Sequence, residues 1–363
     1  MDNLKVFRNN FQISGYLMFD NTPVAKIIND SVIVINKDLI PLYYLNHNPN
    51  IDGWLNGRCF DSSRTNVRLL KRILNIRKCP SKEIAIKFHA ISITDRYWIK
   101  LDNENCSYRD VSSLDDRLYK SSLNGKFVEE AVLNTPEVTN VGSFEKCWKK
   151  ENGVWNLKKL AKDRELFSEI FTFRLGKLFG FNMAEYYYDS SLDCISSPNF
   201  VGKCDKVFLT EIRELMDNDD DVYDNAELIS KLPNGKDLVK QYLDIVFLDS
   251  FIYNFDRHTG NYGFLRDTNT GKIVSMAPNY DNNNSLISRE YRDRTPKIII
   301  DEFKELSNDY NYKVPNVSLQ QIEDVADEVF NNLLKYRSSI KDLKLDKVKL
   351  FLGNNYKELI TIE

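Results

Sequence analysis

The feature that most constrains the fold is a helical segment from Lys236 to about Asn254 that is apolar on nearly every face. It follows a group of turn residues, Pro233 to Gly235, and includes Leu238, Leu243 and Phe247. A helix with no polar face must be buried within a larger lobe. The chain has 363 residues, which is enough for about two or three packed subdomains. We therefore expect a helical lobe built around this segment.

Periodicity in the rest of the sequence indicates an α+β fold. Apolar residues alternate or recur at helical spacing in several other segments. This predicts strands at 12–36, a second strand group around 83–93 that ends near 97–99, and helices at 64–76, 164–179 and from Ser318 onward. Ser318 with Gln321 forms a capping-box pattern, which supports the last of these helices. We divide the chain into an N-terminal α+β module at 1–125, a strand-rich lobe at 126–234 and a helical lobe at 235–363.

Charge and composition exclude several classes of partner. The net charge is -3 at pH 7 with a pI near 5.9, so no overall basic field attracts nucleic acid, and we expect no direct nucleic-acid contact. The longest apolar stretch, from Leu243 to Phe255, is interrupted by Asp244 and Asp249, so we expect no membrane span. The 6 cysteines lack zinc-ligand spacing. Without a signal-peptide pattern at the N-terminus we expect a cytoplasmic protein; delivery into another cell by a route that needs no such signal is the alternative.

An acid and an amide follow the apolar helix directly. Asp256 and Asn261 stand five residues apart, with Gly260 between them to allow a tight loop. In phosphoryl transfer an aspartate orients or deprotonates the attacking hydroxyl, and an asparagine a few residues later supplies an oxygen to the metal. A simple turn is the competing interpretation of this segment, because Asp, Thr and Gly are common turn formers.

A second acid, Asp281, stands twenty residues beyond Asn261, after a strand-like segment at 272–276. Its carboxylate is the kind of hard oxygen ligand that Mg²⁺ prefers. A solvated loop is the alternative for Asp281, since asparagines surround it. The order of the parts favours the catalytic interpretation: a buried helix, an Asp-x4-Asn loop, a hairpin and then an acid.

At these residues the sequence resembles the HipA- and CtkA-like serine/threonine kinase family. The segment 255–261 resembles the catalytic loop of the family, and 280–282 resembles its metal-binding Asp-Asn pair. Residues 142–146 resemble its phosphate-side loop, from which Ser143 and Phe144 depart. The resemblance covers residues 135–340 and only loosely the first 125. It implies a two-lobed protein-kinase-like fold with an additional N-terminal α+β module, and ATP and Mg²⁺ as cofactors.

A kinase also needs a lysine for the nucleotide phosphates and a glutamate to orient it. The family pattern of a glutamate, an apolar helix and a glycine implies Glu169, with Glu165 as the alternative. Trp155 and Leu157 define one face of a strand, and two-residue alternation puts Lys159 on that face. A register shift of one residue would select Lys158 instead.

The resemblance assigns the remaining site residues. It places the adenine-binding hinge at 195–200, including Ser197 and Asn199, and the phosphate-side loop at Gly142 and Ser143. Members of the family phosphorylate a hydroxyl in that loop, which makes Thr139 and Ser143 the candidates for self-phosphorylation here.

We therefore expect an ATP- and magnesium-dependent serine/threonine protein kinase of toxin or effector type, with Asp256 as its catalytic residue and Asn261 and Asp281 as its metal ligands. Its expected partners are a protein substrate and an antitoxin-like protein. The alternatives are a lipid or small-molecule kinase and a non-catalytic, nucleotide-binding partner of a DNA-binding antitoxin.

Overall fold

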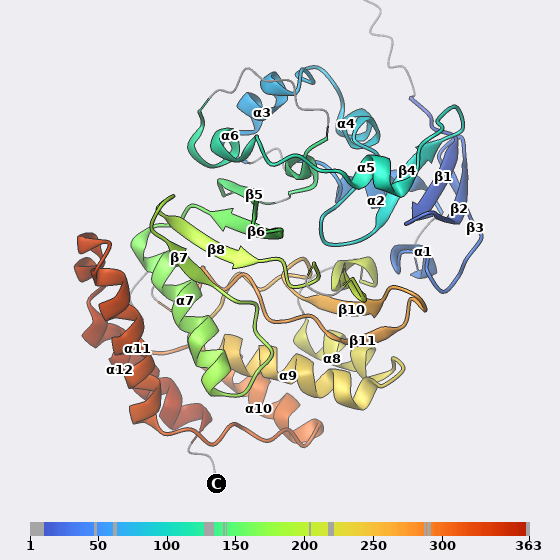
Figure 1. The fold of residues 1–363 in the computed structure, drawn as a ribbon. Helices are drawn as coiled ribbons and strands as arrows, with labels where there is room; N and C mark the ends of the chain where they lie inside the picture. Colours follow the sequence, from blue (N-terminus) through green and yellow to red (C-terminus); the bar gives the residue numbers. More distant parts are fainter. Residues whose placement is uncertain are drawn as a thin grey trace, which may run out of the picture. The chain divides into compact units, whose positions relative to one another are not determined.

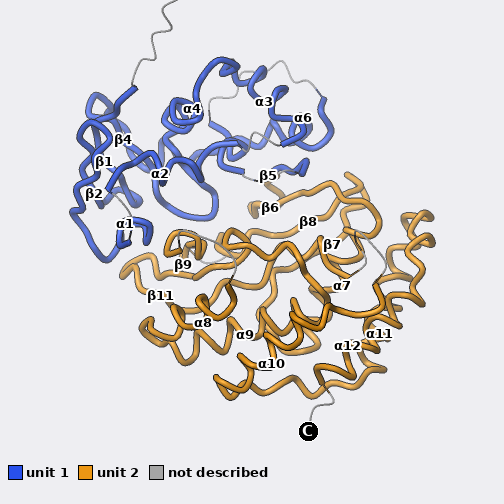
Figure 2. Tube along the Cα trace, turned by 180° about the vertical axis from the view of Figure 1, so that it is seen from behind, with its two compact units in different colours: residues 1–148 blue, residues 149–363 orange. Residues whose placement is uncertain are grey.

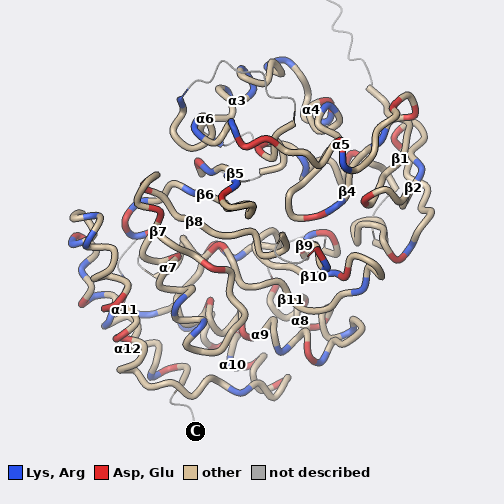
Figure 3. The backbone as a smooth tube through the Cα atoms, viewed as in Figure 1, with Lys and Arg blue, Asp and Glu red and all other residues tan. Residues whose placement is uncertain are grey.

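The computed structural model describes residues 11–46, 49–60, 64–126, 134–140, 142, 144–202, 205–216, 221–286, 288 and 292–360. The chain divides into two compact units, Met1–Trp148 and Lys149–Glu363 (Figure 2). The three-part division at residues 125 and 234 stays a prediction. Acidic and basic residues are interspersed along the elements of each unit (Figure 3).

The first unit contains an antiparallel sheet with the strand order β3-β2-β1-β4 (Figure 1). Its strands are β1 (Gly15–Phe19), β2 (Thr22–Ile28), β3 (Ser31–Val34) and β4 (Tyr97–Leu101). The strands predicted at 12–36 are confirmed. Alternation directs Leu17, Ala25 and Ile27 into the core, where all three are fully buried.

Short helices complete the first unit. They are α1 (Tyr43–Asn46), α2 (Ile51–Asn56), α3 (Val67–Ile73), α4 (Ser81–Lys87), α5 (Tyr108–Ser112), α6 (Tyr119–Asn124) and the 3-10 helix η1 (Pro136–Thr139). The strands predicted at 83–93 are wrong, because residues 81–87 form α4, but the end of that strand group near 97–99 is confirmed as β4. Ile84 and Phe88 lie four residues apart and both pack into a cluster with Leu70 and Leu74, which is the spacing of a helix face.

A second sheet has the order β5-β6-β8-β7 and contains the segment predicted as a hinge. Its strands are β5 (Lys146–Glu151), β6 (Val154–Lys159), β7 (Tyr187–Asp189) and β8 (Cys194–Pro198). Between β6 and β7 lies α7 (Asp163–Leu178), which confirms the helix predicted at 164–179. Gly180, at φ 83°, follows this helix in the left-handed conformation that glycine adopts readily.

The third sheet and the remaining helices form the rest of the second unit. The antiparallel sheet has the order β11-β10-β9, from β9 (Val207–Glu211), β10 (Gly263–Asp267) and β11 (Ile273–Met276). The helices are η2 (Ile212–Glu214), α8 (Val222–Ser230), α9 (Gly235–Ile252), α10 (Lys297–Asp309), α11 (Leu319–Leu334), η3 (Ser338–Leu343) and α12 (Leu345–Leu359).

The apolar segment that opened the sequence analysis is α9, and the prediction that it is buried is confirmed. It packs against α8, α10, α12 and β11 (Figure 1). Phe247 of α9 contacts the rings of Phe179, Phe181 and Phe303. The helix predicted from Ser318 is α11, whose capping box forms as expected. None of the described helices is both long and apolar enough to cross a membrane.

Candidate functional site

The loop after α9 presents Asp256 at an exposed position. The helix ends at Tyr253, whose φ of 51° turns the chain sharply. The side-chain oxygen of Asn254 then accepts a hydrogen bond from the Asp256 N–H at 3.2 Å. Oδ2 of Asp256 accepts a hydrogen bond from the side-chain amide of Asn284 at 2.5 Å. The carboxylate is therefore oriented by an amide yet open to an incoming hydroxyl.

Asn261 closes the same loop from the other end. Its side-chain nitrogen donates to the backbone oxygen of Asp256 at 3.1 Å, and its backbone N–H donates to the His258 oxygen at 2.7 Å. Because the side-chain nitrogen is used within the loop, Oδ1 is the atom that can serve as a metal ligand. The structure thus brings the acid and the amide together across five residues, as the loop prediction requires.

Arg257, between these two residues, connects the loop to the segment that carries Asp281. Its Nε and Nη2 donate to the two carboxylate oxygens of Asp249 in α9, at 2.7 and 2.8 Å. Its Nη1 donates to the backbone oxygens of Asn261 and Tyr280, at 2.8 and 2.7 Å. Burial would lower the pKa of Arg257, but the charge of Asp249 outweighs it, so the pKa is raised and the guanidinium stays charged.

Asp281 lies in a left-handed backbone conformation, with φ at 60°, five residues beyond β11. Its backbone N–H donates to the Tyr186 hydroxyl at 3.0 Å. Its Oδ1 accepts a hydrogen bond from Nζ of Lys159 at 2.5 Å, in an ion pair that links positions 122 residues apart. The predicted metal ligand and the predicted phosphate-binding lysine are therefore neighbours.

The two candidate lysines on β6 point to different environments. Nζ of Lys158 donates to Glu151 at 2.7 Å, Asp189 at 2.8 Å and Ser196 at 3.0 Å, which is a structural network away from Asp281. Burial would lower the pKa of Lys159, but Asp281 and then Glu169 outweigh it, so the pKa is raised. The geometry favours Lys159 over Lys158 as the functional lysine.

Glu169 of α7 is fully buried beside Lys159. Neither of its carboxylate oxygens has a hydrogen-bond partner of good geometry among the described residues, although the Tyr186 hydroxyl and the Asn282 N–H lie close enough to lower its pKa. Burial raises the pKa of Glu169 to about 7, opposed by the charge of Lys159 and reinforced by that of Asp281. The alternative, Glu165, caps α7 by accepting a bond from the Lys162 N–H at 3.0 Å.

The hinge candidates lie on β8 and just beyond it. Ser197 is buried and pairs with Leu157 of β6 in the antiparallel register. The backbone N–H of Asn199 donates to the Trp155 oxygen at 2.8 Å, and its side-chain oxygen accepts a bond from the Val201 N–H at 3.2 Å. An adenine contact at Asn199 would therefore need a group other than these two.

The phosphate-side loop candidates belong to the first unit. Gly142 has a φ of 123°, a backbone conformation that residues with a side chain rarely adopt, so glycine is favoured there. Ser143 lies outside the described residues. Thr139 ends η1, and its hydroxyl donates to the Ile91 oxygen at 3.1 Å.

Sequence reasoning placed Asn282 only in the metal-binding Asp-Asn pair and missed the other buried asparagines around the site. Asn279 and Asn282 accept hydrogen bonds from Nη2 of Arg257 at 2.9 and 2.7 Å, and Asn284 orients Asp256. All three are buried, as is Asn283. The run of asparagines is the signal that could have identified them, because four amides near a candidate metal ligand can satisfy buried polar groups.

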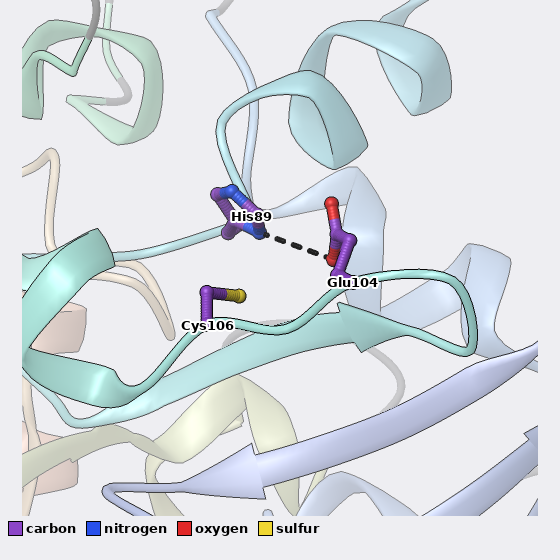
Figure 4. A group of neighbouring side chains, drawn as sticks. All are labelled: His89, Glu104 and Cys106. Carbon is purple, nitrogen blue, oxygen red and sulfur yellow. Dashed lines mark ion pairs between the residues drawn. The ribbon is translucent and has the colours of Figure 1, made fainter.

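Another cluster of possible ligands lies in the first unit, at His89, Glu104 and Cys106 (Figure 4). One ligand atom from each residue lies within 4.8 Å of the others. Nδ1 of His89 also lies 3.1 Å from the Ile99 oxygen, and Glu104 accepts a bond from the Leu101 N–H at 2.8 Å. These bonds account for the arrangement without an ion.

The fold is kinase-like, of the HipA type. The chain matches HipA in the structure of the Shewanella oneidensis MR-1 toxin–antitoxin system, HipA, HipB and operator DNA, with a TM-score of 0.59 and 13% identity. The match covers 96% of this chain and 100% of that chain. The Helicobacter pylori proinflammatory kinase CtkA is also matched, with a TM-score of 0.43, 17% identity and coverage of 59% of this chain and 91% of that one. No protein-family model and no curated protein matches the sequence.

The buried carboxylate of Glu169 predicts a pH-dependent stability. Its pKa rises from an ordinary 4.5 to about 7 on folding, so the folded state holds the proton more tightly. The contribution of this proton to the stability of the folded state is complete below the ordinary pKa. It is lost as the pH rises through about 7. We would measure the free energy of unfolding in urea at about pH 5 and about pH 8. From the lower to the higher pH it should fall more for wild type than for Glu169→Gln.

Glu165→Gln is the matched control, because it removes from the same helix a carboxylate that raises the pKa of Lys159 less than Glu169 does. Glu165→Gln should show the same difference in free energy of unfolding between the two pH values as wild type does. If the free energy of unfolding changed equally with pH in wild type and in Glu169→Gln, the raised pKa could not be assigned to Glu169.

Proposed function

We propose that this protein is an ATP- and magnesium-dependent kinase that transfers a phosphoryl group to serine or threonine hydroxyls of a protein. The observation that carries the proposal is the contact between Lys159 and Asp281, with Glu169 buried beside them, in a HipA-type fold. A kinase requires a lysine and two acids close together. The lysine binds the nucleotide phosphates, one acid binds the metal ion and the other orients the lysine.

Asp256 acts on the acceptor hydroxyl. Its exposed carboxylate orients the hydroxyl and accepts its proton, while the bond from Asn284 fixes the rotamer of the carboxylate. Arg257 is a positioning residue, because it donates to the backbone oxygens of Asn261 and Tyr280 and so holds the loop against the segment before Asp281.

Asn261 and Asp281 fit a magnesium site because they offer an amide oxygen and a carboxylate, the hard oxygen ligands that Mg²⁺ takes. When bound, the ion would neutralise charge on the transferring phosphate. Lys159 would then divide its three donors between Asp281 and the nucleotide phosphates. Glu169 keeps the ammonium group in place through its charge.

The resemblance supplies the finer parts of the proposal. It assigns Gly142 and Ser143 to the nucleotide phosphates and the backbone at Ser197 and Asn199 to adenine. It also suggests a toxin or effector role with an antitoxin-like partner, and the HipA structure contains HipB. A cytoplasmic location belongs to the same proposal.

Replacing Asp256 by asparagine should abolish transfer, because an amide of the same shape cannot accept the proton. Wild type incubated with magnesium and γ-labelled ATP, alone and with a cell lysate, should label protein. Asp256→Asn should reduce the rate by roughly 10²-fold or more while its ATP affinity and melting temperature stay near wild type. Asp309→Asn, which changes an exposed aspartate at the end of α10, is the control and should leave transfer unchanged.

Other outcomes separate the alternatives. Label in the lipid fraction or in small metabolites would favour a lipid or small-molecule kinase. ATP binding without any transfer would favour a non-catalytic partner of an antitoxin. Near-normal turnover by Asp256→Asn would remove Asp256 from its proposed role.

We also expect self-phosphorylation at Thr139 or Ser143. Modification of Thr139 would require its hydroxyl to leave the Ile91 oxygen, and the added charge of about -1.5 to -2 would be repelled by bound ATP. Peptide mass spectrometry after incubation with magnesium and ATP should find a phosphate on residues 138–146 in wild type only. Its absence after prolonged incubation, or its presence in Asp256→Asn, would contradict this.

A further inference from the structure

A buried ion pair in the first unit joins residues that are 73 positions apart in the sequence. Nη2 of Arg64 lies 3.1 Å from Oε2 of Glu137, and their side chains are 0% and 1% exposed. Burying two charges is costly unless each finds further hydrogen bonds. The backbone groups that form these further hydrogen bonds with Arg64 and Glu137 are therefore the part of the chain that the pair holds in place.

These groups lie on both sides of residues 141–145. Nη1 of Arg64 donates to the Asn140 oxygen at 3.3 Å, and its Nη2 also donates to the Lys146 oxygen. Oε1 of Glu137 accepts a hydrogen bond from the Trp148 N–H at 2.7 Å. The pair thus fixes the chain just before the candidate phosphate-side loop and the first residues of β5 after it.

The beginning of β5 is connected to the candidate lysine through a hairpin. β5 and β6 are neighbours in their sheet and are joined by two residues, Asn152 and Gly153. In such a hairpin the first residue of one strand lies at the same end as the last residue of the other. Lys146 begins β5 and Lys159 ends β6, so the end of β5 that the ion pair fixes is the end that carries Lys159.

We propose that the Arg64–Glu137 pair is a positioning device for nucleotide phosphates, acting through the β5–β6 hairpin that carries Lys159. This rests on the proposed function, because it assumes that Lys159 meets the phosphates. Arg64 and Glu137 do not touch the nucleotide in this proposal. They set the backbone from which the lysine-bearing hairpin extends.

The test compares Arg64→Lys with a matched variant, Arg58→Lys. Arg58 forms another buried ion pair in the same unit, with Asp95, at 7% and 9% exposure, and it also donates to the Ala90 oxygen, which lies outside β5. A lysine keeps the charge but cannot reproduce the fork of donors in either place. Both variants should therefore lose thermal stability.

Only Arg64→Lys should weaken ATP binding, by about tenfold or more, because it displaces the phosphate-binding end of the hairpin. Its affinity for adenosine, which has no phosphates, should stay at the wild-type value. Arg58→Lys should bind both ligands as wild type does. A general loss of structure would weaken ATP and adenosine together, so the ratio of the two affinities separates positioning from folding.

Glu137→Gln provides a second variant, nearly the same in shape as the wild-type residue, in case Arg64→Lys does not fold. It should also weaken the binding of ATP but not that of adenosine. ATP affinity at the wild-type value in Glu137→Gln or in folded Arg64→Lys would overturn the inference while leaving the proposed function intact. An equal loss of affinity for ATP and for adenosine in these variants would overturn the inference as well. If wild-type protein binds no ATP, the proposed function fails and this inference fails with it.

Discussion

The hydrogen bonds of Arg257 are the interaction on which the site depends. One guanidinium group joins α9, through Asp249, to the loop of Asp256 and Asn261 and to the segment of Asp281. Removing it would leave a largely buried carboxylate and several polar groups without their donor, which typically costs about 3–5 kcal/mol. A lysine could not replace it, because a single ammonium cannot reach acceptors on three segments in fixed directions. The buried helix α9 thus anchors Arg257, which in turn fixes the loop of Asp256 and Asn261 and the segment of Asp281.

The charge balance around Lys159 gives a physical reason to expect a metal ion. Two carboxylates, Asp281 and Glu169, surround one buried ammonium group, so the cluster carries excess negative charge when both acids are ionised. Burial raises the pKa of Glu169 to about 7, against the charge of Lys159 and with a smaller contribution from Asp281. A divalent cation at Asp281 would relieve the excess negative charge and would favour the ionised form of Glu169. In the proposed site, metal binding and the orientation of Lys159 would therefore be coupled through the charge of Asp281.

Periodicity predicted the parts of the fold whose hydrophobic pattern is long. The helices at 164–179 and 236–254 were recognisable because burial of α7 and α9 requires apolar residues over several turns. Strand alternation selected Lys159, which the structure places against Asp281. The region of α4 was mistaken for a strand because seven residues contain too few turns to distinguish the two periods. Tertiary packing around Ile84 decided that case. The Arg64–Glu137 pair could not be found from the sequence, since neither residue has a local pattern that indicates its distant partner.

Binding of ATP with and without magnesium tests the central claim, that Lys159, Asn261 and Asp281 form a metal-dependent nucleotide site. Calorimetric titration of wild type should show affinity for ATP that rises strongly when magnesium is added. Asp281→Ala should bind ATP with nearly the same affinity in both conditions, because the carboxylate that holds the ion is gone while Lys159 still meets the phosphates. The same magnesium dependence in wild type and in Asp281→Ala would contradict the account.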